Sequence, residues 1–445
     1  MATLKKHIVC GLLFAVCFFS YAQGGFSLRE DEKFEKVKFD FVNNLIVLPV
    51  KVNGVELSFI LDTGVNKPIL FNITDSDSVE IKNTKEIILR GLGGGQPIKA
   101  LHSKGNVFKL GDVYNYNQDF YLITDSGLNF SPQMGYKVHG IIGYDLLKNF
   151  VVEVDYSAKK MKFYNPDSYN YKRCNKCETL PLTLEGSKAY VYANVKQYTA
   201  IDEKKVKLLI DSGSSDALWL FENTEGEISG PLKFFDDFLG YGLSGKVHGK
   251  RARVQRFTLG EFELKEAKVA YPDAVSIQYI TSMRDRNGSI GSEILRRFDL
   301  VFDYTNEQIT FKRNGNFKDP FKYNMSGIEL QHNGLRMVKA LVRNEEGYAK
   351  NESNNQGVKI YLQKQYNFEL HPALEIAEIR DGSPAAIVGL REGDVILQVN
   401  KKNVHNYSLQ QVSEMMNERV GKTVYVTVER SGSTLKFNFK LQKVL

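Results

Sequence analysis

The sequence lacks the residue groupings on which most metal and nucleotide sites depend. Its seven histidines are scattered without ligand spacing, and only two of its four cysteines form a Cys-x-x-Cys motif, Cys174 to Cys177, with no second motif of this kind. A zinc site is therefore not expected. No glycine-rich loop is followed by Lys-Ser or Lys-Thr, so residues 91–95 are not a phosphate-binding loop. We expect no cofactor.

Long apolar runs are also missing, except at the N-terminus. Residues 8–19 are apolar, follow Lys5-Lys6 and precede Ser20-Tyr21-Ala22. This pattern is typical of a secretory signal peptide cut after Ala22, because the run is short for a bilayer span. An uncleaved anchor is the alternative. We predict an exported protein, periplasmic or extracellular, with no membrane span after cleavage. In that setting Cys174 and Cys177 are expected to form a small local disulfide.

The charge balance gives no sign of a nucleic-acid partner. The formal charge of +7 falls to +5 once Lys5 and Lys6 leave with the signal peptide, which is a thin excess. No run of Lys and Arg is interleaved with aromatic residues. The 42% apolar and 25% charged residues are typical of a globular protein, and 445 residues allow two or three domains.

Two short stretches stand out among what is present. Residues 58–64 run Ser-Phe-Ile-Leu-Asp-Thr-Gly, and residues 208–213 run Leu-Leu-Ile-Asp-Ser-Gly. Each is an apolar strand pattern that ends in an acid, a small hydroxyl residue and a glycine. An ionisable group at the end of a buried strand is costly unless it is paired or functional. Asp62 and Asp211 are therefore candidates for a shared site.

The two stretches belong to a longer internal repeat. Asp62 and Asp211 are 149 residues apart, and so are Gly91 and Gly240. Residues 108–112 match 257–261 at the same offset, and residues 140–143 match 288–291 at 148. Landmarks in one order at nearly one offset indicate an internal duplication. A third triplet, Asp125-Ser126-Gly127, has Ala274 at its partner position and is interpreted as a surface turn.

The rest of the chain predicts a mainly β protein. Runs of alternating apolar residues are separated by turns such as Asn53-Gly54, a strong hairpin pattern. We expect a first lobe over 23–164, a linker over 165–179 that holds the two cysteines, and a second lobe over 180–316. Residues 320–445 form a third domain without a copy elsewhere, with a helix at 408–418 and strands at 424–429 and 435–441.

The order of motifs in each half resembles retropepsin-type aspartic proteases. Two buried carboxyl groups can share one proton and polarise a water between them. The resemblance implies two tandem β-barrel lobes related by a pseudo-two-fold axis, with Asp62 and Asp211 as the catalytic pair. It also implies that segments 141–143 and 289–291 support the catalytic loops. The residues expected to hold those loops are Thr63, Gly64, Ser212 and Gly213, and those expected in two flaps over a peptide are Gly91, Leu92, Gly93, Gly94, Gly240, Tyr241 and Gly242.

The last domain resembles a bacterial, permuted PDZ domain. The resemblance rests on residues 381–386, Asp-Gly-Ser-Pro-Ala-Ala, and 393–396, Gly-Asp-Val-Ile. It implies an α+β fold in which a peptide end adds a strand to a sheet edge. The expected binding strand is Gly327, Ile328, Glu329 and Leu330, with residues 357–360 as second choice. The alternative is a docking domain that clasps the lobes and binds no peptide.

These features predict a monomeric, single-chain aspartic endopeptidase that acts on peptides or proteins. The full chain resembles exported bacterial aspartyl proteases with a C-terminal PDZ domain, which would recruit substrate or regulate cleavage. The alternative is a peptide-binding protein that keeps the cleft and the PDZ domain but has lost turnover.

Overall fold

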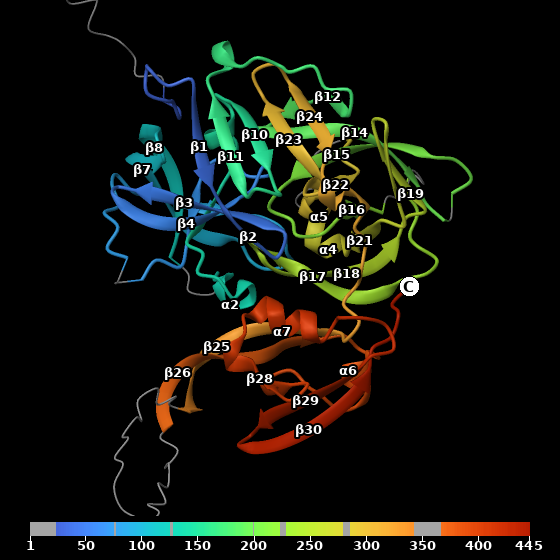
Figure 1. Cartoon of the computed structure of the whole chain (residues 1–445). Helices are drawn as coiled ribbons and strands as arrows, with labels where there is room; N and C mark the ends of the chain where they lie inside the picture. Colours follow the sequence, from blue (N-terminus) through green and yellow to red (C-terminus); the bar gives the residue numbers. More distant parts are fainter. Residues whose placement is uncertain are drawn as a thin grey trace, which may run out of the picture.

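The computed structural model describes residues 24–74, 77–124, 128–198, 200–222, 228–278, 285–341 and 366–445. The predicted signal peptide, the triplet at 125–127 and the second-choice strand at 357–360 lie outside the described residues. The described chain is mainly β, as predicted, and forms two lobes above a C-terminal domain (Figure 1). In these ranges, no helix has both the length and the apolar content needed to cross a membrane.

Lobe 1 is built on one sheet. Its strands are β2 (Asp40–Val42), β3 (Leu45–Val52), β4 (Val55–Leu61), β5 (Ile69–Leu70), β6 (Lys85–Leu89), β7 (Ile98–Leu110), β8 (Val113–Ile123) and β9 (Gly140–Ile142). They lie in the order β2-β3-β4-β9-β5-β8-β7-β6. The predicted hairpin joins β3 to β4, with positive φ at both Asn53 and Gly54, as a two-residue turn of this kind requires. Two short helices, α2 (Ser131–Met134) and α3 (Tyr144–Leu147), flank β9 in the chain.

Lobe 2 repeats this arrangement. Its strands are β13 (Thr183–Glu185), β14 (Lys188–Lys196), β15 (Lys204–Asp211), β16 (Leu218–Leu220), β17 (Phe235–Gly242), β18 (Gly245–Arg253), β19 (Arg256–Leu259), β20 (Phe262–Lys265), β21 (Lys268–Pro272) and β22 (Gly288–Gly291), and its helices are α4 (Ala274–Ile277) and α5 (Ser292–Leu295). The order β14-β15-β22-β16-β21-β18-β17 matches β3-β4-β9-β5-β8-β7-β6 strand for strand. The internal duplication predicted from the offset of 149 residues is therefore present in the fold.

A third sheet joins the lobes. Its strands are β1 (Phe34–Lys38), β10 (Val151–Asp155), β11 (Lys160–Tyr164), β12 (Cys177–Pro181), β23 (Phe298–Asp303) and β24 (Gln308–Arg313). They lie in the order β1-β11-β10-β23-β24-β12, so β10 of one half pairs with β23 of the other. An apolar core runs from this sheet into both lobes. The two halves are therefore one packed unit, which fixes the relative position of their loops.

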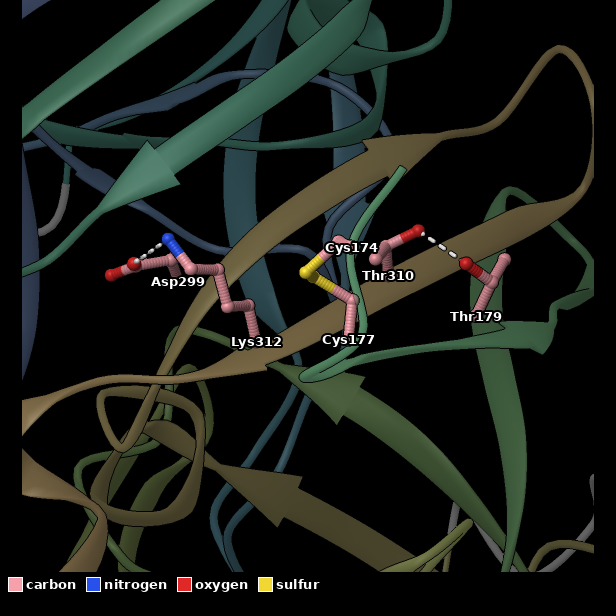
Figure 2. The surroundings of a disulfide bond; sticks show 6 residues. All are labelled: Cys174, Cys177, Thr179, Asp299, Thr310 and Lys312. Atoms are coloured by element: carbon pink, nitrogen blue, oxygen red, sulfur yellow. Dashed lines mark hydrogen bonds and ion pairs between the residues drawn. A yellow bond between two sulfur atoms is a disulfide. The ribbon is translucent and has the colours of Figure 1, made fainter. Parts of the chain in front are cut away.

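The predicted linker ends inside this joining sheet. Strand β12 begins at Cys177, three residues before the expected start of the second lobe, and a 3-10 turn, η1 (Pro166–Ser168), precedes it. Cys174 and Cys177 form the predicted disulfide (Figure 2). Cys177 pairs with Lys312 of β24, and the Thr179 hydroxyl lies 2.7 Å from that of Thr310. The disulfide therefore closes a small loop where the chain enters the sheet.

The C-terminal domain has its own sheet and apolar core. After the turn η2 (Gly315–Lys318), its elements are β25 (Ile328–Leu341), β26 (Tyr366–Ile379), α6 (Pro384–Ile387), β27 (Val395–Val399), β28 (Lys402–Asn403), η3 (Val404–Asn406), α7 (Leu409–Met415), β29 (Thr423–Arg430) and β30 (Ser433–Lys440). The sheet order is β25-β26-β27-β29-β30. Helix α7 begins at the capping box of Ser408 and Gln411, inside the predicted range 408–418.

Candidate active site

The two acidic triplets lie at corresponding strand ends of the two lobes. Asp62 directly follows β4, and Asp211 is the last residue of β15. Each strand runs parallel to its supporting strand, β9 or β22. A Cβ atom on Gly143 would lie 1.9 Å from the Asp62 carbonyl oxygen, and one on Gly291 would lie 2.2 Å from that of Asp216. Only glycine fits there, and segments 141–143 and 289–291 lie against the loops as expected.

Reciprocal hydrogen bonds join the two loops. The Thr63 N–H donates to Ser212 Oγ (3.1 Å), and the Ser212 N–H donates to Thr63 Oγ1 (3.0 Å). Each hydroxyl also donates across the interface: Thr63 Oγ1 to the Ile210 carbonyl (2.6 Å) and Ser212 Oγ to the Leu61 carbonyl (2.8 Å). Both side chains are buried. Breaking any one of these buried hydrogen bonds leaves its partner group unsatisfied, which costs free energy. The bonds therefore fix the position of one loop relative to the other.

The catalytic-loop glycines bring the two carboxyl groups into one site. A Cβ on Gly213 would lie 2.3 Å from Asp62 Cγ, so the Asp62 side chain reaches over the lobe 2 loop. A Cβ on Gly64 would lie 3.0 Å from Asp62 Oδ1 and 3.8 Å from Asp211 Oδ1. The Gly64 N–H donates to Asp62 Oδ1 at 2.7 Å. Both aspartates keep part of their surface exposed, so the site is open to a reactant.

The surroundings favour a proton shared by the pair. Burial, and then the negative charge of Asp211, raise the pKa of Asp62 to about 7. Burial also raises the pKa of Asp211, although Arg286 and the N–H groups of Gly213 and Ser214 act in the opposite direction. Two acids that interact in this way titrate as a pair, so the shared proton is assigned to neither.

Two cations near the pair were missed by the sequence reasoning. Lys188, the first residue of β14, and Arg286, just before β22, both act electrostatically on Asp62 and Asp211. Neither belongs to a motif. Arg286 lies at the repeat offset of 148 from Val138, so a comparison of the halves reveals the exchange of an apolar residue for a cation. The corresponding residue for Lys188 becomes visible only from strand register.

The two predicted flaps contact each other at their tips. The tip of the β6–β7 hairpin contacts the tip of the β17–β18 hairpin, where the Gly95 N–H donates to the Ser244 carbonyl and the Ser244 N–H donates to the Leu92 carbonyl, both at 2.8 Å. A Cβ on Gly91 would lie 2.7 Å from Leu243 Cβ, and one on Gly242 would lie 2.2 Å from the Leu92 carbonyl oxygen. Glycine at these two positions permits the close approach.

The other predicted flap residues have different roles. The Gly93 N–H donates to the Ser276 carbonyl (3.1 Å), while a Cβ on Gly94 would meet only Val275. Gly240 lies at an irregularity in the pairing of β17 with β18 and has a φ of 142°. The Tyr241 ring packs edge-on against Phe238 of its own strand, 4.9 Å between centroids.

An ionic network connects lobe 2 to the C-terminal domain. Arg251 of β18 donates to Asp216, beyond the catalytic loop, at 2.7 Å and to Asp237 of β17 at 2.8 Å. Lys246 of β18 forms an ion pair with Glu378 of β26, and the Arg380 guanidinium lies 4.7 Å from the ring centroid of Phe235. The second flap is therefore held near its tip by Lys246 and near its base by Phe235 and Arg251.

The strand predicted to bind peptide lies partly inside this interface. Gly327, Ile328 and Leu330 are buried, the last two in the core of the C-terminal domain. Glu329 lines a cavity of about 350 Å³, together with Asp237 and Arg251 of the second flap. Strand β25 nonetheless stands at the edge of its sheet.

Lobe 1 also contacts the C-terminal domain, at β25 and α7. Helix α2 lies next to α7 in Figure 1. Gln410 Nε2 of α7 donates to the Met134 carbonyl (2.6 Å), and Gln133 Nε2 donates to Gln331 Oε1 of β25 (3.2 Å). A Cβ on Gly135 would lie 2.9 Å from Leu409 Cβ. Lobe 1 thus covers parts of both β25 and α7.

We predict that Asp62→Asn raises the stability of the protein at neutral pH. The pKa of Asp62 rises from 3.8 to about 7 on folding, so the folded state binds more protons between these values and the free energy of unfolding falls as pH rises. Asparagine removes this penalty. The Tm measured by calorimetry should exceed that of the parent by a few degrees at pH above neutrality, and the difference should shrink toward pH 4.

Asp77→Asn is the matched control, since the sign of its effect is opposite. Despite burial, hydrogen bonds from Lys137 and Thr74 lower the pKa of Asp77 to about 2, so this carboxylate stabilises the fold above pH 4. Its removal should lower the Tm at neutral pH. A pH-independent effect of Asp62→Asn would contradict a shared, buried pair.

We also predict that Gly242→Ala prevents the flap tips from meeting, whereas Gly94→Ala does not. The first Cβ would lie 2.2 Å from backbone at Leu92, and the second would lie 3.2 Å from Val275, an exposed side chain that can turn away. Hydrogen exchange should show faster exchange of the Ser244 amide in the first variant alone. Equal protection in both variants would show that the contact between the tips is unimportant in solution.

Two family models match parts of the chain. Residues 48–146, which contain Asp62 and the first flap, match the family model of aspartyl proteases, and residues 375–430 match that of PDZ domains. No curated protein matches the chain. The chain therefore contains a retropepsin-like aspartyl protease domain and, C-terminal to it, a PDZ domain.

Proposed function

We propose that this protein is an aspartic endopeptidase that hydrolyses peptide bonds with a water activated between Asp62 and Asp211. The observation that supports the proposal most is the reciprocal bonding of Thr63 and Ser212, which holds two partly buried carboxyl groups in one site. One chain supplies both acids, on two lobes of matching strand order that a shared sheet joins. Because no second copy is needed to complete the pair, we propose a monomer.

The chemistry follows from one shared proton. The ionised carboxylate removes a proton from the attacking water, while the protonated carboxyl donates its proton to the peptide carbonyl oxygen. The tetrahedral intermediate then collapses as a proton passes to the leaving nitrogen. The flap tips have to part to admit an extended peptide, and their return excludes bulk water from the reaction.

We further propose that the protein is exported. The apolar run at 8–19 after Lys5-Lys6 supports this location, and the Cys174–Cys177 disulfide is compatible with an oxidising compartment.

Cleavage of a fluorogenic peptide library tests the proposed reaction. Asp62→Asn and Asp211→Asn should each reduce kcat by more than about a hundredfold, since each removes one partner of the acid–base pair. The rate of the parent should fall as the pH rises through about 7, where the shared proton is lost. Asp202→Asn, at an exposed turn residue of lobe 2, is the control and should cleave like the parent.

Two results would contradict the reaction. Cleavage by both variants at the parent's rate would remove the pair from the mechanism. A parent that binds peptides but cleaves none of them between pH 3 and 8 would instead support the alternative, a peptide-binding protein without turnover.

For the PDZ domain we propose that a peptide end adds to β25 in competition with the end of α2. The edge position of β25 supports strand addition, and α2 contacts β25 through Gln133 and α7 through Gln410. Bound peptide would then tether a substrate near the cleft at a local concentration on the order of millimolar. Because the same contacts brace the lobes, peptide binding and bracing exclude one another.

Loosening the α2 contact tests this competition. Gln133→Ala combined with Gln410→Ala should strengthen the binding of C-terminal peptides to the full chain, measured by fluorescence anisotropy in the Asp62→Asn background. Gln398→Ala, which removes a bond to Asn403 within the PDZ domain, is the control and should leave affinity unchanged. If the double variant and the control bind with equal affinity, α2 does not compete. Absence of binding in all variants leaves the domain as a brace.

A further inference from the structure

Lys188 lies beside Asp211 across two neighbouring strands. Strands β14 and β15 are antiparallel with Tyr190 opposite Leu209, and two further residues of this register place Lys188 opposite Asp211. In lobe 1, Val47 lies opposite Ile60 on β3 and β4, so the same extension places Leu45 opposite Asp62. Leu45 is buried, whereas Lys188 is partly exposed. The pseudo-symmetric position thus carries a cation on the lobe 2 side only.

Arg286 breaks the symmetry at a second position. It precedes Gly288, the first residue of β22, by two residues, and Val138 precedes Gly140 of β9 in the same way. Val138 is fully buried, while Arg286 keeps part of its surface exposed. The Arg286 Nε donates to the Gly288 carbonyl at 3.0 Å, and the guanidinium lies 5.2 Å from the ring centroid of Phe221. Both contacts hold the side chain along β22, the strand that supports Asp211.

In the part of the chain that the structure describes, neither cation has a carboxylate partner of its own. Among the described residues, the carboxyl groups that act on Lys188 and Arg286 are Asp62 and Asp211 alone. A pair that shares one proton carries one negative charge, so the four groups together carry a net charge of +1. A partly desolvated cation without a counter-ion is unfavourable. The site is therefore short of one negative charge when it is ready for catalysis.

We propose that Lys188 and Arg286 form a carboxylate-binding subsite that selects substrates with an acidic group next to the scissile bond. The proposal rests on the proposed function, since it assigns the substrate class of the same cleft. The carboxylate could belong to an Asp or Glu side chain or to the C-terminus of a peptide. A guanidinium and an ammonium bind either group through charge-assisted hydrogen bonds, which are stronger than neutral ones.

A second role for the cations has a different consequence. If they served only to lower the pKa of the catalytic pair, their removal would shift the pH profile for every substrate by the same amount. A subsite instead changes the preference between an acidic peptide and its neutral isostere. The ratio of affinities for a Glu peptide and the matching Gln peptide therefore separates the two roles.

Peptide binding to the full chain with Asp62→Asn tests the subsite without turnover. This substitution keeps the pair at one negative charge. The probes are blocked ten-residue peptides in which one Glu is moved through the sequence, each compared with Gln at the same position. A second series compares a free C-terminal carboxylate with the amide. At one or two adjacent positions, or at the free C-terminus, the acidic form should bind roughly tenfold more tightly, and salt should weaken this preference.

The variants use the residues that the protein itself has in lobe 1. Lys188→Leu and Arg286→Val introduce the residues at the matching positions and should abolish the preference for Glu. Lys188→Gln and Arg286→Gln repeat the test if the apolar variants unfold. Lys188→Arg should retain the preference. Lys265→Leu, at an exposed lysine of β20, removes one charge elsewhere and should leave the ratio unchanged.

Each outcome bears on the inference. Equal affinity for Glu and Gln peptides at every position, with the neutral peptides bound, overturns the subsite and leaves the proposed function intact. A Glu preference that survives the loss of both cations also overturns it. Failure of all peptides to bind overturns the subsite and the proposed function together. Loss of the preference in the lobe 1-like variants, with rescue by Lys188→Arg, supports it.

Discussion

The reciprocal hydrogen bonds of Thr63 and Ser212 are the constraint on which the site depends. Two carboxyl groups repel one another when both are ionised, and burial raises the cost of each charge. The loops that carry Asp62 and Asp211 would separate unless something else held them. The four bonds at this point do so without charge, and the joining sheet behind them fixes the distance between the lobes. The glycines follow from the same constraint, because a side chain on Gly213 would occupy the place of the Asp62 carboxyl.

Much of this arrangement could be predicted from the sequence because it is repeated. A motif that occurs once is weak, but the offset of 149 residues between Asp62 and Asp211 also relates Gly91 to Gly240, and the sheets have the predicted symmetry. The disulfide followed from the spacing of Cys174 and Cys177. The flap glycines followed from the repeat, although their reason, the close approach of one tip to the other, became visible only in three dimensions.

What the sequence did not reveal depends on register and on contacts between domains. Lys188 lies 143 residues after Leu45, not 149, because the hairpins of the two lobes differ in length, so sequence comparison misaligns them. Pairing across β14 and β15 is needed to place it opposite Asp211. The contact of α2 with the PDZ domain rests on single hydrogen bonds, such as that of Gln410 with the Met134 carbonyl. No periodicity or composition encodes such contacts.

The two lobes differ in the residues near Asp62 and Asp211 and in the contacts that their flaps make with the PDZ domain. Lobe 2 has two cations that act on Asp62 and Asp211, and its flap is joined by Lys246 and Phe235 to the PDZ domain. Arg251 links the strands of that flap to Asp216, five residues beyond Asp211. A displacement of the PDZ domain would therefore act on the second flap and, through Arg251, on the loop that follows Asp211. In a homodimer of identical halves, any such charged residue or interdomain contact would occur in both lobes. Duplication within one chain allows the second lobe to carry Lys188 and Arg286, while the first keeps the apolar residues Leu45 and Val138 at the same positions.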